Sequence, residues 1–150
     1  MKKMKQKQSG ILILIVLMFV IGCTITTKVN PITEPEISNL CIKYNKDIFV
    51  KEFGQGLKDL LAEKGINAEI YEGDQPEGCY FRMEYTAEWS WDMAMYLEYA
   101  QINVYKDDTL IGDAVYDAKQ GSASFNKFGK TAEKIKPLLD KLFEEATSSN

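Results

Sequence analysis

Residues 79–92 alternate between apolar and polar side chains over their whole length. The apolar positions are Cys79, Phe81, Met83, Tyr85, Ala87, Trp89 and Trp91. Successive side chains of a β-strand point to opposite faces, so this period of two predicts one long strand with a single apolar face. Such a strand belongs in a sheet that is covered on that face.

Weaker patterns surround this strand. The pattern predicts further strands over residues 40–44, 67–72, 96–106 and 110–118, and the last two are expected to form a hairpin around Asp107 and Asp108. Apolar residues recur at helical spacing over 49–61, with Asp47 as N-cap and Gly65 just past the end. A last helix follows Thr131, and Pro137 either kinks it or marks a later start.

The order β-α-β-β-β-β-α predicts an α+β domain over residues 39–147. Two helices would pack on one face of an antiparallel sheet of about four to five strands. Strands and helices do not alternate for long enough to build a doubly wound parallel sheet.

The N-terminus reads as a bacterial export signal. Four lysines within the first seven residues precede eleven consecutive apolar residues, Ile11 to Ile21. That run is too short for a membrane span of about 20 residues and fits the core of a signal peptide. Val20, Ile21, Gly22 and Cys23 resemble a lipobox, in which the cysteine thiol carries the lipid. We therefore expect residues 1–22 to be removed and Cys23 to be lipidated. An uncleaved N-terminal anchor is the alternative.

The expected cleavage makes the chain more acidic. The leader carries four of the 18 basic residues and none of the 22 acidic ones, so the net charge of −4 becomes about −8. This balance argues against nucleic acid as a partner, because nucleic-acid binding needs clustered Lys and Arg. Attachment to a membrane would come through the lipid. Thr24, where an aspartate would indicate inner-membrane retention, favours the outer membrane, with the domain facing the periplasm.

Residues 23–38 look like a flexible tether behind the lipid. They contain Pro31 and Pro35 among Thr, Asn and Glu residues, and such a composition buries too little apolar area to fold alone. Fully extended, residues 24–38 would reach about 50 Å.

Cys41 and Cys79 remain after Cys23 is lipidated. In an oxidising compartment we expect them to form a disulfide. Strict alternation opposes this, since it puts Cys41 beside Lys43 on the outer face and Cys79 beside Phe81 on the core face. Two buried thiols are the alternative.

The chain contains no histidine, which removes histidine-based triads, histidine general bases and most catalytic zinc sites. Glu84 and Glu88 lie on one strand face but about 13 Å apart, wider than the 5–9.5 Å of glycosidase carboxylate pairs. Gly129, Lys130 and Thr131 imitate the end of a phosphate-binding loop, but Ser124 stands where that motif needs glycine. We expect no catalytic residue, no cofactor, no metal and no nucleotide.

Aromatic residues are the remaining candidates for a functional surface. Trp89, Trp91, Tyr96 and Tyr99 fall on neighbouring predicted strands. They either fill the core or form a contact surface for a protein or glycan, and the sequence leaves both open.

Several short motifs resemble a family of small uncharacterised proteobacterial lipoproteins, known by a locus-tag name beginning Sbal. The matching residues are Cys41-Ile42, Gly65-Ile66, Ile70-Tyr71, Cys79, Tyr85-Thr86-Ala87, Ser90-Trp91-Asp92, Ala114, Tyr116, Lys134-Ile135 and Pro137. The family is richer in glycine where this chain has Ser122, Ala123 and Ser124. The resemblance implies a lipoprotein and carries no catalytic residues with it.

The sequence therefore predicts a non-catalytic interaction or accessory module for an envelope protein complex, held at the outer membrane. A binder of a small molecule or glycan is the alternative, and an enzyme would need a close pair of carboxylates in a pocket.

Overall fold

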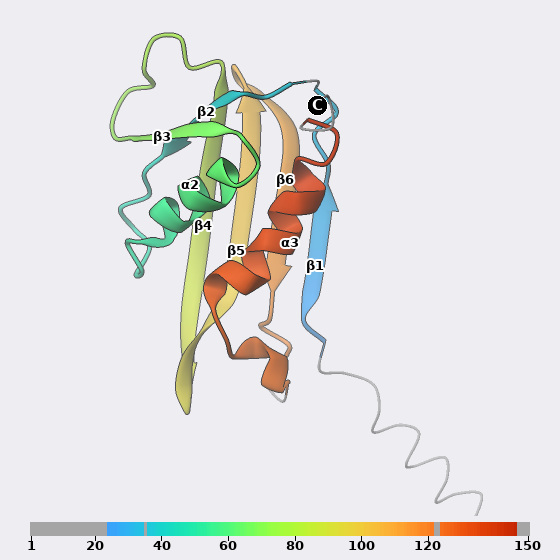
Figure 1. The fold of residues 1–150 in the computed structure, drawn as a ribbon. Coiled ribbons are helices and arrows are strands. Elements are labelled where there is room, and N and C mark those ends of the chain that lie inside the picture. The colour runs from blue at the N-terminus through green and yellow to red at the C-terminus, as the bar shows by residue number, and fades with distance from the viewer. Residues whose placement is uncertain (1–23, 35, 122–123, 147–150) are drawn as a thin grey trace, which may run out of the picture.

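The computed structural model describes residues 24–34, 36–121 and 124–146. These residues form one mixed six-stranded sheet in the order β1-β6-β5-β4-β2-β3, with two helices across one of its faces (Figure 1). The elements are β1 (Thr26–Asn30), β2 (Asn39–Lys43), α2 (Phe53–Ala62), β3 (Asn67–Tyr71), β4 (Phe81–Asp92), β5 (Ala94–Lys106), β6 (Thr109–Asp117), the short 3₁₀ helix η1 (Phe125–Lys127) and α3 (Thr131–Leu142).

The α+β class and the pair of helices on one face agree with the sequence prediction. The prediction of four to five antiparallel strands is wrong in two respects: the sheet has six strands, and it is mixed. β2 pairs in parallel with both β3 and β4, whereas β1, β4, β5 and β6 pair antiparallel. The physical reason is that α2 connects β2 to β3, and a helical crossover returns the chain to the same end of the sheet, which makes the two strands parallel.

The predicted flexible tether over residues 23–38 is also wrong for most of its length. Thr26–Asn30 is the edge strand β1, and it pairs with β6 from Thr26↔Asp117 to Asn30↔Asp113. Ile32 is 0 % exposed, and its backbone N–H donates to the Leu142 carbonyl at 2.9 Å. The folded domain therefore includes β1 and Ile32, which lie ahead of residue 39.

Gly112 on β6 leaves the space that Ile32 occupies, because glycine has no side chain. A Cβ atom on Gly112 would lie 2.5 Å from Ile32 Cγ1 and 3.0 Å from Leu142 Cδ1. Glycine at this position lets Ile32 pack between β6 and α3, and this contact closes the core at the β1 side of the sheet.

Both helices bury one apolar stripe against the sheet. In α2 the buried residues are Phe53, Gly54, Leu57, Leu60 and Leu61; in α3 they are Ile135, Leu138, Leu139 and Leu142. α2 begins later than the sequence pattern predicts, so Phe49 lies outside it and is exposed. α3 runs through Pro137 without a break. No helix within the described ranges is long and apolar enough to cross a bilayer.

Candidate functional site

Cys41 and Cys79 form the expected disulfide, with their Cα atoms 6.1 Å apart. The opposing faces predicted from alternation do not prevent it, because Cys79 lies in the loop before β4 and the strand register begins only at Phe81. Gly78, with a φ of 82°, turns the chain just before Cys79. The bond thus joins β2 to the loop that leads from β3 into β4.

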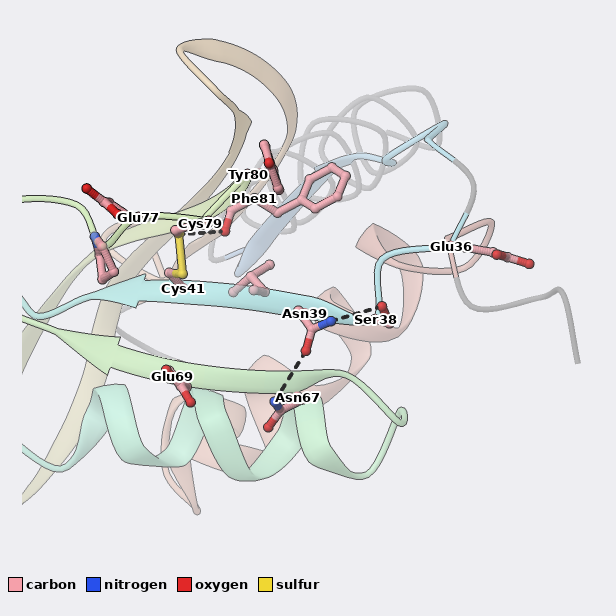
Figure 2. Close-up of a pocket in the computed structure, with 13 residues that line it drawn as sticks. Glu36, Ser38, Asn39, Cys41, Asn67, Glu69, Glu77, Cys79, Tyr80 and Phe81 are labelled. Atoms are coloured by element: carbon pink, nitrogen blue, oxygen red, sulfur yellow. Dashed lines mark hydrogen bonds between the residues drawn. A yellow bond between two sulfur atoms is a disulfide. The ribbon is translucent and has the colours of Figure 1, made fainter.

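This disulfide lies in a half-open groove of about 460 Å³. Figure 2 shows the bond joining β2 to the loop, with Asn39 and Asn67 farther along the paired strands. The Asn67 side-chain amide donates to Asn39 Oδ1 at 3.3 Å. Glu36, Glu69 and Glu77 also line the groove, and no Lys or Arg of the described part of the chain does, so this lining suits a neutral or cationic polar group.

The second candidate surface is the face of the sheet that the helices leave uncovered. Its centre is a column of polar and aromatic side chains on β5. The Tyr99 hydroxyl donates to Gln101 Oε1 at 3.0 Å, and Gln101 Nε2 donates to Asn103 Oδ1 at 3.2 Å. The Tyr105 ring lies under the Arg82 guanidinium, 4.9 Å from its centre. These contacts hold the column in a fixed arrangement.

Charged residues border this column on β4. Glu84 pairs with Arg82 at 3.2 Å, and Glu88 pairs with Lys119 at 2.7 Å. The hydrogen bond that the Lys119 ammonium donates to the Glu88 carboxylate raises the pKa of Lys119, whose ammonium also lies over the Tyr99 ring. Each carboxylate has its own cation, so Glu84 and Glu88 behave as surface ion-pair partners and not as a joint acid/base pair.

The structure does not bring the four predicted aromatic contact residues into one surface. Trp89 is half-buried, packs edge-on against Phe53 at 5.5 Å and lines a small apolar cleft of about 210 Å³ between α2 and α3. Tyr96 is buried against Phe128, with ring centroids 6.0 Å apart. These two residues are structural.

The other two aromatic residues are accessible but separate. Tyr99 belongs to the polar column on the uncovered face. Trp91 is 71 % exposed near the tip of the β4–β5 hairpin. Sequence alternation places Trp89 and Trp91 on one face of β4, yet only Trp89 packs against a helix.

One charged group missed by the sequence analysis is buried near the hairpin. Lys127 is 2 % exposed; its ammonium pairs with the Asp92 carboxylate and lies 4.9 Å from the centre of the Tyr96 ring. Lys134 donates to the Lys127 carbonyl, and burial lowers the pKa of its ammonium. Only the fold reveals this cluster, because nothing in the spacing of these residues marks it.

Cys23, the predicted lipidation site, lies outside the described residues. Within residues 24–34, 36–121 and 124–146, no group of three His, Cys, Asp or Glu side chains is placed to hold a metal ion.

Comparison with known proteins gives a fold and no family. No protein-family model and no curated protein matches the sequence. Among solved structures, the chain is similar to PelC from Paraburkholderia phytofirmans, described as a dodecamer and solved in two crystal forms. The TM-score is 0.54 and the identity 11 % in both, over 82 % of this chain and 98 % and 99 % of the PelC chains. At this identity the likeness shows a common fold alone.

Proposed function

We propose that this chain is a lipoprotein of the bacterial cell envelope that acts by binding a protein partner and not by catalysis. In this proposal Cys23 carries the lipid, the domain faces the periplasm from the outer membrane, and the chain belongs with the small Sbal-type lipoproteins that it resembles. The observation that carries the binding role is the uncovered face of the sheet, with its ordered Tyr99–Gln101–Asn103 column.

The composition of that face supports a protein partner. Tyr and Arg are enriched in protein interfaces because they combine a large contact area with hydrogen-bonding groups. Here Arg82 and Tyr105 are already stacked, and the amides of Gln101 and Asn103 are oriented by their neighbours. A partner would therefore meet a surface whose side chains lose little further freedom on binding.

The lipid anchor has a direct test. Replacing Cys23 by serine is expected to abolish incorporation of an alkyne-labelled palmitate and to remove the protein from the outer-membrane fraction, because lipid is the proposed means of attachment. The matched control is Thr24→Ser, which leaves the thiol in place. Unchanged labelling and fractionation of the Cys23→Ser protein would contradict the assignment.

The binding face is tested by site-specific photo-crosslinking in intact envelopes. A photoreactive amino acid at Gln101 is expected to give a discrete protein adduct, because this position lies at the centre of the uncovered face. The same group at Gln55, which is exposed on α2, is the control and should give none. Equal adducts from both positions, or none from Gln101, would count against the proposal.

Two outcomes of the crosslinking would refine the partner. An adduct of twice the chain mass would identify a second copy of the chain, which the likeness to a dodecamer favours.

The alternative function is binding of a small molecule or glycan in the groove at Cys41–Cys79, where the exposed ring of Tyr80 lies beside amides and carboxylates. In that case Gln101 would yield no protein adduct.

A further inference from the structure

The start of β1 and the tip of the β4–β5 hairpin lie at the same end of the sheet, and the hairpin extends beyond the other strands. Thr26 of β1 pairs with Asp117 of β6, which pairs with Tyr99 of β5, which pairs with Glu88 of β4. Past this row the β4–β5 hairpin continues alone through Trp89–Asp92 and Ala94–Leu97. Figure 1 shows the hairpin tip, η1 and the start of β1 at the same end of the molecule.

The tip of this hairpin is apolar and exposed. Trp91 is 71 % exposed and Met93 91 %, while Met95 is half-exposed; Phe125 on η1 is 88 % exposed. Met93 occupies the turn with a φ of 60°, a left-handed conformation that usually selects Gly, Asn or Asp. An apolar side chain at this turn has no packing role to explain it.

The tip is also nearly without net charge. Asp92 is the only ionisable residue between Trp89 and Met95, and its carboxylate pairs with the buried ammonium of Lys127. The Lys127 side chain is 2 % exposed and the Asp92 side chain 51 %, so the buried ammonium balances a carboxylate that still reaches the surface. An apolar tip whose one carboxylate has a paired cation can enter the headgroup region, because the Asp92 carboxylate can stay hydrated there while the apolar side chains insert.

The short distance in sequence between Cys23 and β1 places the proposed lipid, and with it the bilayer, close to this tip. Only Thr24 and Ile25 separate Cys23 from β1, and three residues of extended chain reach about 10 Å. A Cβ on Gly121 would lie 3.0 Å from Ile25 Cγ1, so Ile25 itself packs against the domain. The hairpin extends about 13 Å past the row that contains Thr26. A lipid on Cys23 therefore brings the tip to the level of the bilayer surface.

We propose that Trp91, Met93, Met95 and Phe125 form a membrane-contact surface that inserts into the interface of the bilayer to which Cys23 is anchored. This inference rests on the proposed lipidation of Cys23. The occupant of the surface is phospholipid, and tryptophan is a preferred residue at the boundary between headgroups and acyl chains. The domain would then be held by two contacts, which fix its orientation and direct the rest of the sheet away from the membrane.

The two tryptophans of the chain provide the test. Full-length lipidated protein is reconstituted into phosphatidylethanolamine and phosphatidylglycerol vesicles that contain brominated phosphatidylcholine, a quencher of tryptophan emission. Trp89→Phe leaves Trp91 as the only reporter, and Trp91→Phe leaves Trp89 as the matched control. We expect the emission of Trp91 to fall about twofold at interfacial depth, and that of Trp89 to stay unchanged.

Trp89 packs against Phe53, so a second variant is needed that leaves this contact unchanged. Met93→Asp places a charge at the tip in a conformation that aspartate accepts, so the fold is retained. Its tryptophan quenching should fall to the level of Trp91→Phe while the protein still floats with the vesicles. Flotation of Trp89→Phe without quenching of Trp91 would overturn the membrane-contact surface alone. Failure of the unsubstituted protein to float would overturn the lipid anchor and this inference with it.

Discussion

Replacing Cys41 and Cys79 together by serine is expected to lower the free energy of unfolding by about 3–4 kcal/mol. The disulfide closes a loop with a sequence separation of 38, and cross-linking a loop of this length removes entropy from the unfolded chain. The midpoint of thermal unfolding should fall by about 10–20 °C for a domain of this size. Urea titration followed by far-UV circular dichroism measures the change.

The same bond is expected to hold the groove together. Without it, the loop before β4 keeps a polar contact in which Arg82 Nη1 donates to Gln75 Oε1 at 2.6 Å, but it loses its covalent link to β2. Reduction of the unsubstituted protein is the matched control and should reproduce the lower stability of the double variant. An unchanged urea midpoint in both would show that the loop is held by other contacts.

Ile32→Ala is expected to lower the free energy of unfolding by about 2–5 kcal/mol, the usual cost of removing a fully buried aliphatic side chain. Ile32 is 0 % exposed and lies against Gly112 and Leu142. The change leaves a cavity between β6 and α3 that neighbouring side chains fill only in part.

Thr33→Ala is the control for this effect, because Thr33 is exposed on the same segment. Its free energy of unfolding should stay within about 0.5 kcal/mol of the unsubstituted protein. The comparison is made by urea unfolding of the two variants. Equal stabilities would mean that the segment before β2 contributes nothing to the core, as a tether would.

The long strand β4 and the final helix α3 were predictable because each buries one face along most of its length. β4 keeps the apolar alternation over most of its length, and the hairpin of β5 and β6 turns at Asp107, which has a φ of 51°. The stripe Ile135, Leu138, Leu139 and Leu142 likewise marks α3 in spite of Pro137.

β1 was missed because an edge strand buries little. Of Thr26–Asn30 only Val29 packs against the core, so the segment carries the polar composition of a linker. The parallel pairing of β2 was missed because local periodicity reports which face is apolar and not which strands become neighbours. That choice depends on α2 packing back onto the sheet.

The candidate site was less predictable than the fold for a related reason. Alternation assigns Trp89 and Trp91 to one face, but it does not say how far the helices extend along that face. Trp89 packs against Phe53 of α2, whereas Trp91 stays exposed in the hairpin that projects past the rest of the sheet. The groove at Cys41–Cys79 depends on a loop that crosses to β2, and no local pattern encodes such a crossing.

The position of β1 has a consequence for biogenesis. Its partner β6 is more than eighty residues away in the sequence, and pairings between such distant segments are slow to form because they must close a long loop. Strands β2 to β6 need no residue ahead of Asn39 for their own ladder. If the chain is exported and lipidated as proposed, most of the sheet can assemble while residues 23–30 are still accessible to the enzymes that acylate and trim the N-terminus. Docking of β1 would then draw the finished anchor against the domain as the last step of maturation.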